Sequence, residues 1–209
     1  MQYHELAGDL QAHEPGHSEF LPPKLDAHLD LRAALERIPP AATAKAMFVK
    51  RLLRELACRG LPLPFEDSFL AFQDVPLALC AELNVHAARV LHPGLPLLDG
   101  LRRVARWSFE TFQDSVAGQL ILTGTQRNPH PTLALASRLV SLTTNVGTLQ
   151  SVYLTPNSRL IRARDSYFFP ESFGVGMAEG VLNACDKQGH VLVRAYSPTD
   201  VDFLIGWGA

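Results

Sequence analysis

Long hydrophobic runs are missing from this chain of 209 residues, although 47% of its residues are hydrophobic. A helix that crosses a bilayer needs about 20 consecutive apolar residues, so we expect no membrane span. Charged residues make up only 19% of the chain. Because disorder combines high charge with low hydrophobicity, the sequence predicts a folded protein with a hydrophobic core.

Cysteine is scarce, and Cys58, Cys80 and Cys185 lie far apart. Three dispersed cysteines form no disulfide framework, and without a C-x-x-C pair they do not begin a zinc site. We therefore expect reduced thiols in a cytoplasmic protein, with no bound metal. Neither sign of charge dominates, since 19 basic and 21 acidic residues give a net charge of −2. This balance argues against nucleic acid as a partner.

The first 24 residues have neither the basic start nor the apolar stretch of a signal peptide. His13 and His17 have the spacing of a helical metal pair, but Pro15 and Gly16 between them break such a helix. We expect residues 1–24 to be a flexible or surface-lying leader. Residues 25–209 are then expected to form a single domain.

Apolar residues at helical spacing dominate the chain up to Gly147. Val49, Leu52, Leu53 and Leu56 form one apolar helix face, and Gly60 is placed to end that helix. We expect helices over about 25–38, 49–60, 76–91, 96–116 and 132–142. The expected inner face of the fourth helix consists of apolar residues only: Leu97, Leu101, Val104, Ala105, Phe109 and Phe112.

The remaining sequence has the pattern of short strands. Residues 151–155 and 159–164 are separated by a Pro-Asn-Ser turn, which predicts a hairpin. Strands are expected over 191–196 and 201–207, after a helix over 172–185. In the last strand, Phe203 and Trp207 should share one face. The order predicts an α+β fold: N-terminal helices packed on a C-terminal twisted antiparallel sheet of about four strands, interrupted by one helix.

Sequence motifs of catalysis are absent. The chain has no phosphate-binding glycine loop, no dinucleotide fingerprint and no G-x-S-x-G segment. Gly176 and Gly180 are four residues apart, which predicts a helix that lies close on the sheet rather than a ligand contact. Cys80 and His86 fall on different helix faces, so they make a poor nucleophilic pair. We predict no catalytic residue, although a spatial triad stays open.

Two histidines of the third expected helix have alternative interpretations. His86 lies on the apolar stripe, where it is either a hydrogen-bonded core residue or an axial haem ligand in a deep pocket. His92 precedes Pro93-Gly94, and we expect it to shape the end of the helix.

Arg102, Arg103 and Arg106 form a positive patch, with Glu110 four residues after Arg106. The patch is either a solvated helix face or the contact surface for an anion or an acidic partner. Six aromatic residues are candidates for an apolar pocket between the 97–112 helix and the sheet, although clusters of this size also form cores. They are Trp107, Phe109, Phe112, Phe168, Phe173 and Trp207.

Four segments together resemble a known family. They are ARVLHPGLPL at 88–97, GLRRVAR at 100–106, GVGMAEGVL at 174–182 and VDFLIGW at 201–207. Their order resembles an uncharacterised family of about this length found chiefly in myxobacteria, over roughly residues 48–207. The closing half is similar, more distantly, to a group comprising the 4-vinyl reductase domain, the heme–nitric-oxide-binding domain and transport-particle (TRAPP) subunits.

This wider resemblance implies either a small ligand held between helices and sheet or a dimeric scaffold. The tyrosine–serine–arginine motif that grips haem propionates in that group is absent, since neither Tyr153 nor Tyr167 is followed by the matching residues. Pro198 and Asp200 stand where 4-vinyl reductase domains often carry cysteines. We therefore expect no haem, no metal and no other cofactor.

Three functions follow from these observations. The first is a non-enzymatic domain that binds or senses a small apolar molecule. The second is a protein–protein interaction scaffold, as a homodimer or with another protein, that uses the Arg102–Arg106 patch beside Trp107. Arginine and tryptophan are favoured at such interfaces. The third is an enzyme that acts on a small organic molecule, for which the sequence offers no motif.

Overall fold

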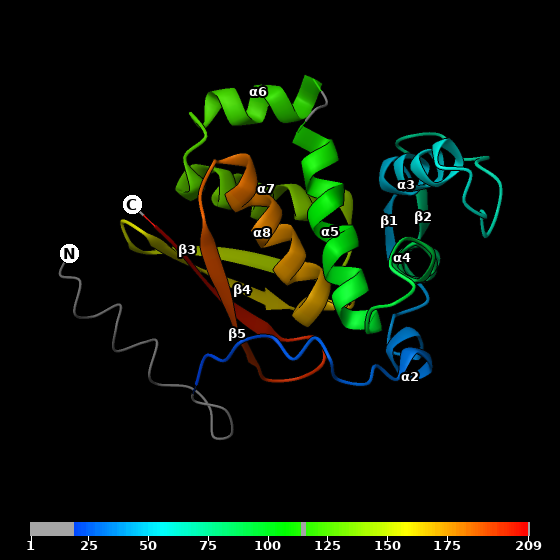
Figure 1. Cartoon of the computed structure of the whole chain (residues 1–209), viewed down its shortest axis with the longest axis horizontal. Coiled ribbons are helices and arrows are strands. Elements are labelled where there is room, and N and C mark those ends of the chain that lie inside the picture. The colour runs from blue at the N-terminus through cyan, green and yellow to red at the C-terminus, as the bar shows by residue number, and fades with distance from the viewer. Residues whose placement is uncertain (1–18, 114–115, 209) are drawn as a thin grey trace.

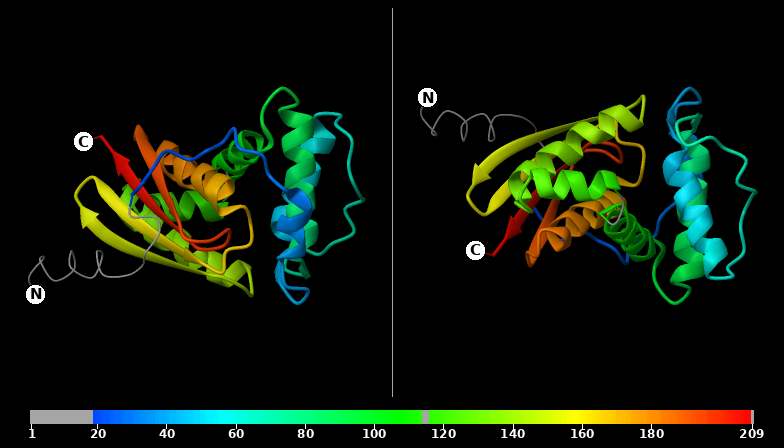
Figure 2. Two further views of the ribbon diagram at one scale, coloured as in Figure 1. Left: turned by 90° about the horizontal axis from the view of Figure 1, so that it is seen from below. Right: turned by 90° about the horizontal axis from the view of Figure 1, so that it is seen from above.

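The computed structural model describes residues 19–113 and 116–208. It places an N-terminal unit of helices beside a larger unit in which helices cover a sheet (Figure 1). Figure 2 shows the N-terminal unit as a separate layer at one end of the molecule, with the loop between α3 and β2 along its outer edge. The helix that joins the two units in sequence and in space is α5 (Leu97–Gln113).

The N-terminal unit contains helices α2 (Leu31–Glu36), α3 (Met47–Cys58) and α4 (Leu77–Leu91). The apolar face predicted for α3 is confirmed, because all four of its residues are buried. Gly60 ends that helix with φ +65°, a left-handed conformation that glycine adopts readily. Pro76 caps α4 at the predicted N-terminus, and the His92 backbone N–H closes its other end on the Ala88 carbonyl.

Two features of this unit differ from the sequence prediction. The helix expected over 25–38 is only six residues long, because Asp30 caps its start by accepting a hydrogen bond from the Ala33 N–H. A two-stranded antiparallel ribbon of β1 (Thr43–Lys45) and β2 (Asp74–Pro76) was not predicted. Three-residue strands are too short to show a period-2 pattern.

The C-terminal sheet confirms the predicted α+β class. Its four antiparallel strands are β3 (Thr148–Thr155), β4 (Ser158–Arg164), β5 (Gly189–Ala195) and β6 (Val201–Trp207), in the order β3-β4-β6-β5. Phe203 and Trp207 share one face, as predicted, and both belong to the core under the helices.

Helices α5, α6 (Val116–Gly124), α7 (Pro129–Thr143) and α8 (Val175–Ala184) surround one side of the sheet, and the π-helical turn η1 (Pro170–Gly174) precedes α8. Helix α5 confirms the helix predicted from about residue 96, whereas α6 is a further helix that was not predicted. Helix α7 begins earlier than predicted, since Asn128 caps it and Pro129 occupies its first turn.

The two glycines of α8 face α5, which corrects the prediction that they lie against the sheet. A Cβ atom at Gly176 would stand 2.0 Å from the Arg102 carbonyl oxygen, and one at Gly180 would stand 2.7 Å from the Phe109 Cβ. The packing role itself is confirmed, because the missing side chains let the two helix backbones approach each other.

Buried apolar side chains form two clusters. The first joins the N-terminal unit to α5 and includes Leu53, Leu83 and Leu101; the second lies between α5, α8 and the sheet and includes Val181 and Phe203. Within the described ranges, no helix is long and apolar enough to cross a membrane.

Candidate functional site

The six aromatic residues predicted to line one pocket divide between the two core clusters. Three pack against the first cluster: Trp107, Phe168 and Phe173. The other three belong to or pack against the second: Phe109, Phe112 and Trp207. Phe168 and Phe173 contact each other edge to face, with ring centroids 4.6 Å apart, whereas Trp207 contacts His130 at the far end of the sheet.

The predicted arginine patch also divides. Arg102 is fixed by ion pairs to Glu179 of α8 and to Asp99, with nitrogen–oxygen distances of 2.7 and 3.0 Å. These partners raise the pKa of Arg102, with the Glu179 hydrogen bond the largest cause. Arg102 therefore fastens α5 to α8. Arg106 is held more loosely, 4.0 Å from Glu110 and 3.9 Å from Glu179.

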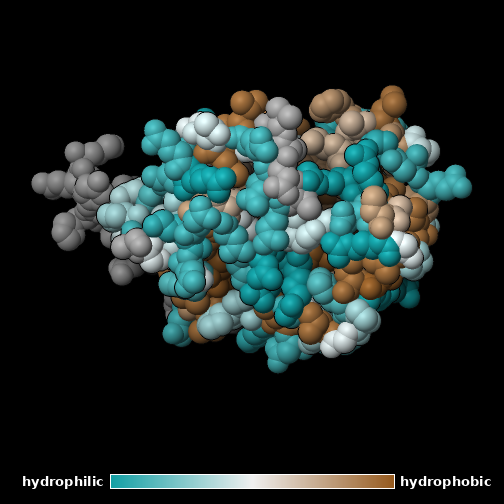
Figure 3. All heavy atoms as spheres, turned by 45° about the horizontal axis from the view of Figure 1, so that its top comes forward, coloured by the Kyte–Doolittle hydropathy of each residue, from teal (hydrophilic) through white to brown (hydrophobic). Residues whose placement is uncertain are grey.

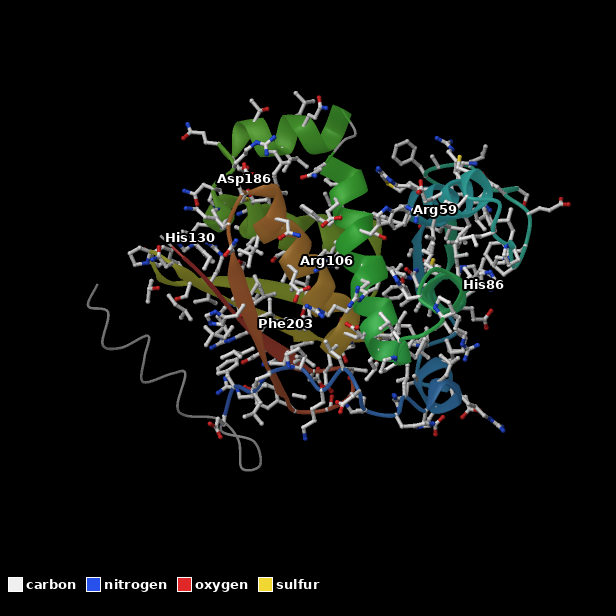
Figure 4. All side chains as sticks on the ribbon, in the orientation of Figure 1. Arg59, His86, Arg106, His130, Asp186 and Phe203 are labelled. Carbon is white, nitrogen blue, oxygen red and sulfur yellow. The ribbon has the colours of Figure 1, made fainter. Side chains whose placement is uncertain are left out.

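A depression of about 140 Å³ lies where the ends of α3 and α4 meet α5. We call it the Trp107 depression. Trp107, Leu91 and Val104 supply its apolar wall, and its other lining residues are polar or charged: Arg59, His92, Arg103, Arg106 and Glu110. The Arg59 guanidinium carbon lies 5.6 Å from the centroid of the Trp107 ring. Figure 4 labels Arg59 in the N-terminal unit and Arg106 beside α5.

Among the residues that line the depression, the sequence indicated Arg103, Arg106 and Trp107 as site residues but not Arg59. That residue caps α3 and lies 38 positions before the start of α5, so no local spacing connects it to the patch. The signal that could have found it is weak: arginine next to the helix-ending Gly60 only shows that the side chain lies at a helix end.

Arginines outnumber carboxylates among the residues that line the depression. Burial lowers the pKa of His92, and the charges of Arg103, Arg59 and Arg106 lower it further, against the opposing charge of Asp99. His92 lines the same depression as these three arginines, and its neutral form is favoured. Its backbone caps α4, as the sequence predicted.

A second depression of about 270 Å³ lies between the β1–β2 ribbon and the end of α7. Its polar groups are occupied by contacts within the chain. Lys45 pairs with Asp74 at 2.7 Å, and the Asn145 side chain accepts from the Thr43 N–H and donates to the Ala41 carbonyl. This arrangement connects the two units and leaves few groups to bind a ligand.

The candidate metal and nucleophile residues are not assembled into a site. No group of three His, Cys, Asp or Glu residues that could hold a metal ion occurs in the described part of the chain. The His86 Nε2 atom lies 2.7 Å from the Pro62 carbonyl oxygen, which supports the interpretation of a hydrogen-bonded histidine. Burial raises the pKa of the Cys80 thiol to about 11, so this thiol is a weak nucleophile. His13 and His17 lie outside the described residues.

The fold is similar to that of H-NOX proteins of known structure. The Fe(II) unliganded H-NOX protein from K. algicida matches with a TM-score of 0.59 and 16% identity, over 79% of this chain and 97% of that one. A variant of the Tt H-NOX protein gives a TM-score of 0.60 at 11% identity, over 79% and 95%. The S. oneidensis H-NOX protein in the Fe(II)NO state gives 0.54 at 9%, over 79% and 99%. At these identities the likeness shows the fold alone.

The described residues do not fit the iron-bearing group of those proteins. A haem needs an axial His, Cys, Met or Tyr ligand inside a deep pocket. Neither depression, at about 270 and 140 Å³, is the deep pocket that a haem needs. No described histidine is fully buried. The space between α5, α8 and the sheet is filled by close helix packing.

No curated protein sequence matches the chain. A family model described as "Protein of unknown function (DUF2378)" matches residues 37–208. That match spans most of the chain and includes the second core cluster, the first cluster except Ala34, and every residue of the Trp107 depression. The chain therefore belongs to the DUF2378 family.

Proposed function

We propose that this protein is a non-enzymatic domain that binds or senses a small molecule, and that the molecule binds in the Trp107 depression. The observation that carries the proposal is the combination found there: an apolar wall with an aromatic ring, beneath polar groups contributed by three helices. Ligand sites generally combine an apolar lining with a few convergent polar groups.

The position of the depression supports a sensing role. Trp107, Leu91 and Val104 belong to or pack against the cluster that joins the N-terminal unit to α5. A molecule bound there touches α3, α4 and α5 at once, so its binding energy can favour one arrangement of the two units over another. The distant resemblance of the closing half to 4-vinyl reductase and transport-particle domains, which implies a small ligand held between helices and sheet, is part of the same proposal.

Native mass spectrometry of the full chain tests the proposal. We expect the protein, as purified or after incubation with a library of small aromatic compounds, to carry extra mass that is lost on denaturation. Trp107→Ala should abolish that mass, and Trp207→Phe, in the second cluster, should retain it. A clean apo mass in every condition would contradict the proposal.

A second candidate function is an interaction scaffold that forms a homodimer. Three exposed apolar side chains favour it: Phe48 on α3 and Leu70 and Phe72 on the following loop, which are 47%, 77% and 78% exposed. Figure 3 shows hydrophobic atoms among hydrophilic ones at the end of the molecule that the N-terminal unit forms. Exposed apolar groups of this size often mark interfaces.

Light scattering coupled to size-exclusion chromatography tests the scaffold. Leu70→Ser with Phe72→Ser should convert a dimer into a monomer. The patch at Arg102 and Arg103 is a poorer target, because reversing the charge of Arg102 also breaks its ion pair with Glu179. A wild-type protein that elutes as a monomer at high concentration would contradict this candidate.

A further inference from the structure

We infer that the ligand class of the Trp107 depression is a small monocarboxylic acid with a planar apolar body. This inference rests on the proposed function and deepens it. The carboxylate would lie among the guanidinium groups of Arg59, Arg103 and Arg106, and the apolar body would lie against Trp107 and Leu91.

The charge of the lining selects an anion. Arg59, Arg103 and Arg106 supply three positive charges, and Glu110 supplies the one negative charge among the lining residues. Within the described residues, Arg59 and Arg103 make their ion pairs with Glu55 and Asp99 through Nε, so their terminal guanidinium nitrogens lie outside those pairs. Planar guanidinium groups match the geometry of a carboxylate.

The same lining disfavours a doubly charged ligand. Glu110 lines the depression and lies 4.0 Å from Arg106. Its carboxylate repels a second negative charge on the ligand, so a monocarboxylate should bind better than a phosphate dianion. Arg102 does not contribute, because Glu179 and Asp99 occupy its guanidinium.

The volume and the aromatic ring limit the rest of the ligand. A space of 140 Å³ equals about five water molecules at their liquid volume, which suits a molecule of the size of benzoate. Trp107 and Leu91 provide apolar surface for the body of the ligand. Because the planar Arg59 guanidinium already lies over the Trp107 ring, we expect a flat ligand to stack beside it.

Isothermal titration of the full chain with benzoate, with neutral benzamide and with inorganic phosphate tests the inference. We expect benzoate to bind at least about tenfold more tightly than benzamide or phosphate, since one charge-assisted contact is lost with benzamide. Arg106→Gln and Arg103→Gln should each weaken benzoate binding by about fivefold. This loss is smaller than the roughly tenfold loss expected for benzamide, because solvent screens the contact between each partly exposed arginine and the carboxylate. Arg138→Gln, an exposed arginine of α7 outside the depression, is the matched control and should have no effect.

Each outcome decides the inference. Benzamide binding as tightly as benzoate, with no loss in the arginine variants but loss in Trp107→Ala, overturns the carboxylate class and leaves the proposed function intact. Benzoate binding that Trp107→Ala does not change overturns both. Absence of any binding overturns the inference alone, because the mass-spectrometric test covers other ligand classes. Unchanged thermal melting of the variants confirms that they fold.

Discussion

Asp202 is the most deeply buried charged residue in the described part of the chain, with its side chain 2% exposed. Arg164 and Arg194 each lie 2.9 Å from one of its carboxylate oxygens, and the Tyr196 hydroxyl donates a hydrogen bond to it. The ring of Phe20 covers Arg194 at 4.5 Å, so the first described residues of the chain help to close this network.

Asp202→Asn should therefore lower the free energy of unfolding by about 3 kcal/mol, because it leaves two guanidinium groups unpaired beside a buried amide. Urea denaturation measures this loss. Asp186→Asn is the matched control: its ion pair with Arg127 is long, at 3.5 Å, and exposed, so its removal should cost less than about 0.5 kcal/mol. Equal effects of the two substitutions would refute this account of the network.

Glu171, in η1, should give the stability of the protein a dependence on pH. Burial raises the pKa of its carboxyl above the usual 4.5, with Lys24 opposing the shift. Below the unfolded pKa both states hold the proton, and as pH rises through the folded pKa the folded state loses stability. Glu171→Gln should therefore stabilise the protein at neutral pH, by less than about 1 kcal/mol after solvent screening.

Denaturation at pH 7 and at about pH 3.5 checks this prediction, since the variant and the wild type should agree at the lower pH. A destabilised variant at pH 7 would mean that Glu171 makes a favourable ionic contact instead.

At the scale of elements, the contact between α5 and α8 depends on the absence of side chains at two positions. Gly176→Ala would bring a Cβ within 2.0 Å of backbone, which cannot move aside as a flexible side chain can. We expect a loss of about 3 kcal/mol or more in the free energy of unfolding. Gly124→Ala, where nothing lies within 4 Å, should cost nothing or stabilise slightly. Thermal denaturation compares the two, and equal melting temperatures would contradict the packing account.

The elements that could be predicted are those in which apolar residues recur at the spacing of a helix or a strand. The buried face of α3 and the shared face of Phe203 and Trp207 follow from spacing. The β1–β2 ribbon could not be predicted, because three-residue strands are held by pairing over a distance of about 30 residues. Helix α6 could not be predicted as a separate element either, since no proline or glycine lies between Phe112 and Val116.

At the scale of the whole molecule, the candidate site was only half visible in the sequence. Arg103, Arg106 and Trp107 are neighbours on one helix, so their patch could be predicted. Arg59 lines the same depression only because α3 and α4 pack near α5. Arg102 does not line it, because its guanidinium pairs with Glu179 of α8. Both changes depend on tertiary contacts that no local pattern contains. The six aromatic residues belong to two clusters for the same reason, and a single pocket that includes all of them stays a prediction.

The central claim is that a small molecule binds beside Trp107, at the seam between the two units. The most direct measurement is a ¹⁹F NMR titration of the full chain labelled with 5-fluorotryptophan, because the protein has only two tryptophans. Small aromatic probes, charged and neutral, are added up to about 10 mM, where weak sites still fill. We predict that at least one probe shifts the Trp107 resonance to saturation and leaves that of Trp207 unchanged. Two resonances that never move, or that move together without saturating, would contradict the claim.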